Sequence, residues 1–182
     1  MRCLREKGYA ATTARDLVAA SHTNLASIGY HFGSKERLLD EAIARGFEEW
    51  AAEVERAMFE VESASPAQRF AASLEAMVGR FEELRPYLVA FVEALPRAVR
   101  SPELREILAR AYAECREAGA RMATATLAGA GVEVNEAQAR DLASVGMAIC
   151  DGLMIQWLLD PDATPGASEV MTALGLAMAG AT

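Results

Sequence analysis

The chain has 182 residues, a hydrophobic fraction of 52% and a formal net charge of −8. This length suits one core, or a small head packed on a larger body. Three scattered cysteines and two histidines show no zinc-ligand spacing, and the sequence has no nucleophile–base–acid set or phosphate loop. These features argue against an enzyme, a metal site and a cofactor. Alanine, leucine and methionine supply much of the apolar fraction and favour helices, so we expect an all-α fold.

Charge is distributed unevenly along the chain. Residues 1–45 contain seven basic and five acidic side chains and carry +2, so the remaining residues carry −10. Both lysines of the chain, Lys7 and Lys35, lie in this first segment. The asymmetry favours a head that meets an anion and a solubilising acidic body, although the basic excess alone is too small to identify DNA binding.

The chain begins with two short predicted helices. Residues 1–7 are expected to form a helix that Gly8 ends, which makes this first helix short. Thr13-x-x-Asp16 has the pattern of a capping box, in which each of the two side chains bonds the backbone of the other residue. It predicts a second helix over residues 14–20.

A third short helix and a long fourth helix follow. Asn24 is a good N-cap for a helix over residues 25–32, and Gly33 is expected to end it. Ser34 is then placed to cap a long amphipathic helix that begins at Lys35. Two short helices joined by a turn of three to four residues predict a helix-turn-helix within residues 1–45.

The rest of the chain predicts five more helices, about nine in all, separated by proline, glycine and capping residues. The expected ranges are 67–84, 86–95, 102–128, a segment capped by Asn135 that ends near residue 159, and 168–178.

Residues 142–159 contain one formal charge, Asp151, and approach the length of a membrane span. The same segment contains Ser144, Gln156 and two glycines and lacks a basic flank. A helix covered by a partner subunit has this composition too, and we favour that interpretation over a membrane span. Residues 1–7 are polar and charged, unlike a secretory signal, so we expect a cytoplasmic protein with reduced thiols.

The segment GYAATTARDLVAASHTNLASIGYHFGSKERLLDEAI resembles the N-terminal head of the TetR family of bacterial transcription regulators. Its distinctive parts are GY-x-x-TT, DLVAA and IGYHFGSKERLL. The stretch DGLMIQWLLDPD, residues 151–162, also resembles the end of the dimerisation helix in many family members. The resemblance implies a DNA-binding helix-turn-helix domain over residues 1–45, with a shortened first helix, and a ligand-binding and dimerisation domain over residues 46–182.

The resemblance also implies which residues meet DNA. The helix over residues 25–32 would enter the major groove, with its first residues at the base edges and other matching positions on phosphates. Tyr30 has the alternative of packing at the edge of the head, His31 that of an ordinary surface residue, and Leu25 is divided between core and DNA. The implied DNA-binding residues are Thr13, Asn24, Leu25, Ala26, Ser27, Tyr30, His31 and Lys35.

Six apolar or aromatic residues of the body lie at helical spacing. Residues of this kind either line a ligand cavity between bundle helices or belong to the core, and the core is the more common case. The six candidates are Met77, Phe81, Phe91, Tyr112, Met122 and Met154.

From the resemblance we expect a ligand-responsive repressor. It would bind an inverted-repeat, palindromic operator in double-stranded DNA as a homodimer, paired through residues 135–160 and 168–178, and an unknown small-molecule effector would release it. The alternative is a dimeric ligand-binding or interaction protein that has lost DNA binding. The short first helix and the weak charge of the head motivate this alternative.

Overall fold

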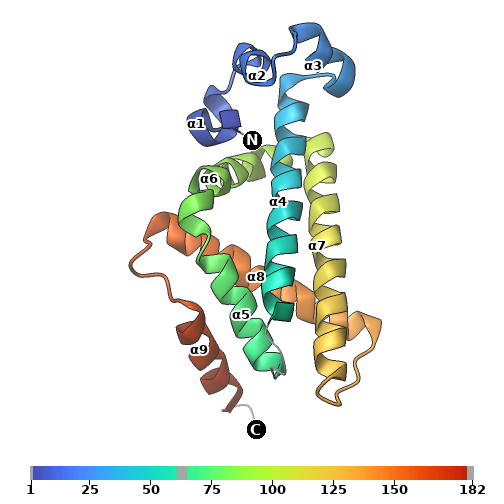
Figure 1. Ribbon diagram of the computed structural model, residues 1–182, viewed down its shortest axis with the longest axis vertical. Coiled ribbons are helices and arrows are strands. Elements are labelled where there is room, and N and C mark those ends of the chain that lie inside the picture. The colour runs from blue at the N-terminus through green and yellow to red at the C-terminus, as the bar shows by residue number, and fades with distance from the viewer. Residues whose placement is uncertain (1, 61–64, 180–182) are drawn as a thin grey trace. The chain divides into compact units, whose positions relative to one another are not determined.

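The computed structural model describes the backbone of residues 2–60 and 65–179, and their side chains except those of residues 5, 10, 47–55 and 57–60. This described part of the chain contains nine helices and no strands (Figure 1). The predicted all-α fold of about nine helices is confirmed. The helices are α1 (Arg2–Ala11), α2 (Ala14–Ser21), α3 (Leu25–Phe32), α4 (Lys35–Glu60), α5 (Pro66–Val78), α6 (Phe81–Ala98), α7 (Pro102–Ala128), α8 (Glu136–Leu159) and α9 (Ala167–Ala179).

The helices form two compact units, and each unit combines segments that are distant in the sequence. The first unit consists of residues 1–49 and 83–113, and the second of residues 50–82 and 114–182. Three helices, α4, α6 and α7, therefore begin in one unit and end in the other. The N-terminal helices α1–α3 share their unit with nearly all of α6 and the start of α7.

The helix α1 is interrupted at Gly8, as the sequence predicts, but one more helical turn follows the interruption. Gly8 adopts φ 74° and ψ 177°, a conformation that favours glycine. The hydroxyl of Thr12, a fully buried residue, donates to the Gly8 carbonyl oxygen at 2.6 Å and holds the end of α1.

Contacts with α2 hold the first half of α1 in place. Leu4 is fully buried, and a guanidinium nitrogen of Arg2 donates to the Ala20 carbonyl oxygen at 3.2 Å, in the last turn of α2. The ammonium of Lys7 lies 2.5 Å from a carboxylate oxygen of Asp16, in the first turn of α2. The short α1 therefore touches both ends of α2.

The start of α2 has the capping box that the sequence predicts. The backbone N–H of Asp16 donates to the Thr13 hydroxyl at 3.2 Å, and the Thr13 backbone N–H donates to the Asp16 carboxylate at 2.8 Å. These bonds satisfy two of the amides that a helix start leaves without a partner.

The boundary between α5 and α6 differs from the sequence prediction. We expected helices over residues 67–84 and 86–95, but the break falls at Gly79 and Arg80. Pro86 lies inside α6 instead of opening it. It lies beyond the first turn of α6, so its missing N–H leaves one helical hydrogen bond unmade, and the same holds for Pro96. The glycine, not the proline, marks the end of the preceding helix.

In the second unit, α5 packs against both α8 and α9, and α9 runs beside α5 (Figure 1). Small residues allow close approach between α7 and α8, since a Cβ atom placed on Gly119 would lie 3.0 Å from the Cβ atom of Ala143. The rings of Phe81 and Trp157 pack with their centroids 5.5 Å apart. The buried face of α8 thus meets helices of its own chain.

Candidate nucleic-acid interface

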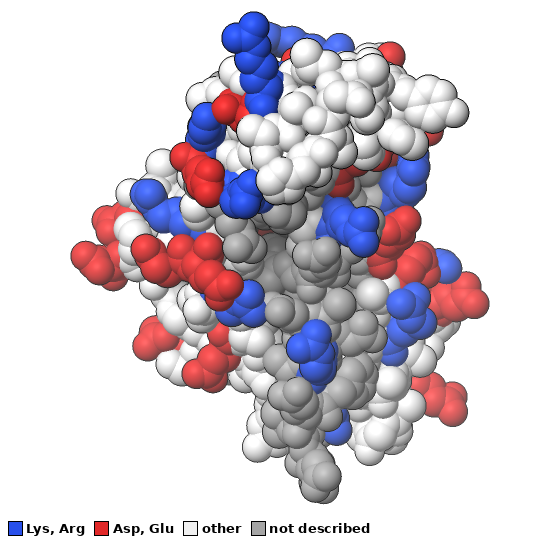
Figure 2. All heavy atoms as spheres, turned by 45° about the horizontal axis from the view of Figure 1, so that its top comes forward, with Lys and Arg blue, Asp and Glu red and all other residues white. Residues whose placement is uncertain are grey.

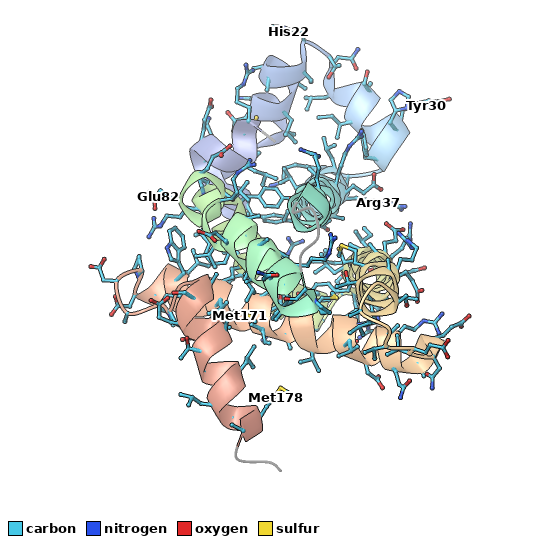
Figure 3. All side chains as sticks on the ribbon, turned by 60° about the horizontal axis from the view of Figure 1, so that its bottom comes forward. His22, Tyr30, Arg37, Glu82, Met171 and Met178 are labelled. Carbon is cyan, nitrogen blue, oxygen red and sulfur yellow. The ribbon has the colours of Figure 1, made fainter. Side chains whose placement is uncertain are left out.

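The turn between α2 and α3 is built from short polar residues. His22 ends α2 in the left-handed conformation, with φ 55°, and it lies at the tip of this turn (Figure 3). The hydroxyls of Ser21 and Thr23 share a hydrogen bond of 2.8 Å across the turn. The turn reverses the chain within three residues, so α2 and α3 form the predicted helix-turn-helix.

Helix α3 begins at a capped and exposed N-terminus. The side-chain oxygen of Asn24 accepts hydrogen bonds from the backbone N–H of Ser27 at 2.9 Å and from its hydroxyl at 3.2 Å. Asn24 is thus the N-cap that the sequence predicts, and the structure gives it this role in addition to the DNA contact that the resemblance implies. An exposed helix N-terminus presents backbone N–H groups and a partial positive charge, which suit a phosphate.

The first turn of α3 divides its side chains between the core and solvent. Ile28 is buried in the head, whereas Leu25 is 56% exposed and Ala26 is exposed beside it. Helix α3 has eight residues, and its exposed Leu25 leaves an apolar surface that does not pack in the core of the head, unlike the buried Ile28. Apolar side chains of this size fit the methyl groups of thymine in the major groove.

Two aromatic side chains lie exposed near the end of α3. Tyr30 is 86% exposed and points away from the head (Figure 3), and His31 is exposed next to it. Their rings meet edge to face, with centroids 5.0 Å apart. A tyrosine this exposed contributes nothing to the core of its own unit, so packing at the edge of the head does not account for it.

Lys35, at the start of α4, is held within the head. Its ammonium donates to the Thr12 carbonyl oxygen at 3.0 Å and lies 3.4 Å from a carboxylate oxygen of Glu36. Thr13, one residue after this carbonyl, is exposed. Lys35 therefore fixes the loop that presents Thr13, a function that sequence reasoning did not assign to it.

Figure 2 shows a largely uncharged surface over the head, with Lys and Arg side chains at its margin. Acidic side chains are frequent elsewhere on this face of the molecule. Among the described residues, no group of three or more histidine, cysteine or acidic side chains is arranged as a metal site.

A second exposed apolar surface lies on α8. This helix is long and apolar enough to cross a membrane by length and composition, yet only 17% of its most apolar stretch is buried within the chain. One side packs on α5 and α7, and the other side is open. Its exposed apolar residues are Leu142, Val145, Ile155 and Leu159, and α9 adds Leu176 and Met178.

The six candidate ligand residues fall into the two units. Phe91 and Tyr112 belong to the first unit, where their rings stack with centroids 6.3 Å apart. The other four, Met77, Phe81, Met122 and Met154, belong to the second unit. All except Tyr112 and Met122 are fully buried, as core residues are.

Sequence reasoning missed a buried polar cluster in the first unit. The Tyr9 hydroxyl donates to the Asp40 carboxylate at 2.5 Å, and the Arg97 guanidinium lies 4.3 Å from the centre of the Tyr9 ring. Arg97 Nη1 is also 3.6 Å from an Asp40 carboxylate oxygen. Burial raises the pKa of Asp40 and that of Tyr9 above their ordinary values. These residues are too far apart in the sequence for any local pattern to connect them.

The geometry defines a helix-turn-helix protein whose second helix, α3, is capped and exposed, and two family models agree with it. The model described as bacterial regulatory proteins of the tetR family matches residues 1–42. The model described as the C-terminal part of BetI-type transcriptional repressors matches residues 37–177, most of the chain. The chain belongs to the TetR family of transcriptional regulators, which is a family of DNA-binding regulators and not of enzymes.

Several solved structures are similar over nearly the whole chain. A putative transcriptional regulator from Saccharomonospora viridis in complex with choline is 24% identical, with a TM-score of 0.64 over 96% of this chain and 88% of that one. The TetR-family regulator PfmR from Thermus thermophilus is 27% identical, with a TM-score of 0.57 over 96% and 94% of the two chains. A putative TetR-family regulator from Rhodococcus sp. is 21% identical, with a TM-score of 0.72 over 96% and 91%. No curated protein matches the chain in sequence.

Proposed function

We propose that this TetR-family regulator is a cytoplasmic, ligand-responsive repressor. It binds an inverted-repeat operator as a homodimer, and a small molecule that occupies the body releases it. In this proposal residues 1–45 bind DNA, and residues 46–182 bind the ligand and form the dimer. The observation that carries the proposal is α3: a capped N-terminus, an exposed Leu25 and an almost fully exposed Tyr30 on a helix that buries Ile28.

The residues of the head divide into two kinds of DNA contact. The base-reading candidates are the leading residues of α3, because the first residues of a recognition helix reach the base edges. They are Asn24, Leu25, Ala26 and Ser27. The remaining DNA-binding candidates are assigned to phosphates, which fix the position of the head without reading sequence. They are Thr13, Tyr30, His31 and Lys35.

The open face of α8 supports the homodimer. Four exposed apolar side chains on a helix this apolar would cost stability in a monomer, and a second copy of the same face would cover them. Leu176 and Met178 of α9 are exposed too, so α9 leaves further apolar side chains that a partner could cover. A two-fold pair of heads explains why an inverted repeat is expected, with half-sites about 34–36 Å apart.

The effector is proposed to be a small molecule held by the body, and choline is the first compound to test. A similar structure contains choline, whose quaternary ammonium is attracted to the faces of aromatic rings. The body of this chain contains two aromatic pairs, Phe81 with Trp157 and Phe91 with Tyr112. A ligand releases DNA only to the extent that it prefers the conformation that does not bind DNA.

The decisive experiment is fluorescence anisotropy of the protein with the DNA upstream of its own gene, at two salt concentrations. We expect tight, sequence-selective binding that weakens steeply with salt, because phosphate contacts release counterions. Binding that is weak and equal on scrambled DNA contradicts the proposal and favours a dimeric ligand-binding protein without an operator.

Choline is then added to the complex, with the neutral isostere 3,3-dimethylbutan-1-ol as the control. Release by choline alone supports a cationic effector, and no release by choline excludes it as the effector.

A further inference from the structure

The helix-turn-helix lacks the side chains that most often recognise base edges by hydrogen bonding. In the major groove, arginine or lysine pairs with guanine, asparagine or glutamine pairs with adenine, and an acidic side chain accepts from cytosine. Residues 17–34, which include most of α2, the turn and all of α3, contain no Lys, Arg, Gln, Asp or Glu. The single amide side chain in this range is that of Asn24, so it alone is suited to a bidentate pair with a base.

Asn24 is already engaged by the helix that it caps. Its side-chain oxygen accepts from the backbone N–H of Ser27 at 2.9 Å and from the Ser27 hydroxyl at 3.2 Å. An amide oxygen has two lone pairs, and a bidentate pair with adenine requires this oxygen to accept from the adenine amino group. Such a pair would therefore disrupt the N-cap of α3. The Ser27 hydroxyl gives its one hydrogen to Asn24, so toward a base it is left as an acceptor.

The two residues between Asn24 and Ser27 are apolar and exposed. Leu25 is 56% exposed, and Ala26 is exposed beside it. Their side chains neither donate nor accept hydrogen bonds, and the apolar group that base pairs present in the major groove is the C5 methyl of thymine. The first turn of α3 thus combines two free apolar side chains with two polar side chains that are bonded to each other.

We propose that α3 reads its operator through the methyl groups of thymine, which Leu25 and Ala26 contact, and not through hydrogen bonds to the base edges. The inference rests on the proposed repressor function and adds the chemical feature of the operator that the protein recognises. Each half-site then requires a pyrimidine with a C5 methyl group where these two side chains enter the groove. The hydrogen-bonding pattern of the base pair at that position is not read.

The test uses duplexes that separate the methyl group from the hydrogen-bonding edge. The operator is located in the DNA upstream of the gene by footprinting, and each half-site thymine is replaced in turn by uracil, 5-methylcytosine or cytosine. Uracil loses the methyl group and keeps the edge of thymine, whereas 5-methylcytosine, paired with guanine, keeps the methyl group and changes the edge. At the contacted thymine, thymine and 5-methylcytosine should bind alike and more tightly than uracil and cytosine. Equal binding of thymine and uracil at every half-site position overturns the proposal.

The size of the effect follows from the burial of one methyl group. Each methyl group should contribute about fourfold in affinity, and a symmetric replacement by uracil in both half-sites should weaken binding about 14-fold. Anisotropy titrations measure these ratios. The slope of log affinity against log salt should be the same for the thymine and uracil duplexes, because this slope reports on phosphate contacts and not on methyl groups.

The protein side of the contact is tested with Leu25→Ala. Leu25 is exposed in the free protein, so its truncation leaves the core of the head intact, and circular dichroism checks the fold. The preference for thymine over uracil should fall toward 1 in this variant. It should persist in Val132→Ala, a truncation of a 47% exposed apolar side chain in the loop before α8. An unchanged preference in Leu25→Ala assigns the methyl effect to the DNA itself and rejects the contact.

The unmodified duplex separates this inference from the proposed function. If the protein binds no upstream duplex selectively, the proposed function fails, and the reading of thymine methyl groups fails with it. If it binds the unmodified operator selectively and tightly but does not distinguish thymine from uracil, the repressor function stands and only the inference is refuted.

Discussion

The ammonium of Lys35 donates to the Thr12 carbonyl oxygen at 3.0 Å, at a position where the family resemblance implies a phosphate contact. Both roles are compatible, because an ammonium has three N–H donors. We expect Lys35→Gln to weaken DNA binding about equally on all sequences and to reduce the slope of log affinity against log salt by about 1. Lys35→Arg, which keeps the charge, should retain most of the slope. Anisotropy titrations across a salt series measure the affinity and its slope. If Lys35→Gln left the slope unchanged and lowered the Tm, Lys35 would stabilise the head through its bond to Thr12 and would not contact a phosphate.

The ion pair between Lys7 and Asp16 makes a pH-dependent contribution to stability. Hydrogen bonds from Lys7 and Thr13 lower the pKa of Asp16 well below its ordinary value of 3.8. A lowered pKa in the folded state stabilises the fold at pH values above the ordinary pKa, and this contribution is lost as the pH falls below 3.8. Asp16→Asn should therefore reduce the Tm at pH 7 and matter progressively less as the pH falls from about 4 to about 2. Thermal unfolding across this range checks it, with Glu106→Gln as an exposed control from the same unit.

At the scale of single helices, α3 contains one glycine inside it and one directly after it. Gly29 lies within the helix, and a Cβ atom placed on it would meet nothing within 4 Å. Gly29→Ala should raise the free energy of unfolding by about 0.5–1 kcal/mol, because alanine loses less backbone entropy in a helix. Gly33 also has open space but adopts φ 77°, where a Cβ atom is strained, so Gly33→Ala should destabilise by about 1–2 kcal/mol. Denaturant unfolding measures both, and effects of the same sign would contradict the conformational argument.

Helix boundaries are predictable wherever a capping residue fixes them locally. Thr13, Asn24 and Asn135 cap α2, α3 and α8 as their sequence patterns predict, because the bonds involved reach only three residues along the chain. The predicted boundary between α5 and α6 is wrong, because Pro86 indicates a helix start in the sequence and lies inside a helix in the structure. Proline is favoured in the first turn of a helix, and α6 contains Pro86 and Pro96 beyond that turn, so the local preference does not fix this boundary.

The candidate site shows the same division between local and distant contacts. The burial of Ile28 follows from the helical spacing of the apolar residues of α3, whereas the same spacing left Leu25 divided between core and DNA. Asp40 and Arg97 cannot be paired from the sequence, because their contact depends on how α4 and α6 meet in the folded unit. The same limit applies to Lys35, whose bond to Thr12 crosses from α4 to the loop before α2.

At the scale of the whole molecule, the open face of α8 predicts a homodimer. Val145 is 60% exposed on this face, and Val132, 47% exposed, lies in the loop before α8. Val145→Asp should convert the protein to a monomer, because a carboxylate at the centre of an apolar interface is left without a partner. Val132→Asp should keep the dimer. Sedimentation or light scattering gives the mass of each variant, and a Val145→Asp dimer as stable as the wild type would place the interface elsewhere.

The composition of the first unit has a consequence for how the protein is made. Residues 1–49 leave the ribosome well before residues 83–113, which complete the same compact unit. At about 5–20 residues per second, several seconds of synthesis separate the two segments. During this interval three side chains that are fully buried in the finished unit, Leu4, Leu39 and Ile43, lack the segment that completes the unit. We therefore expect the nascent N-terminal segment to expose apolar side chains, which chaperones can bind, until residues 83–113 complete the unit.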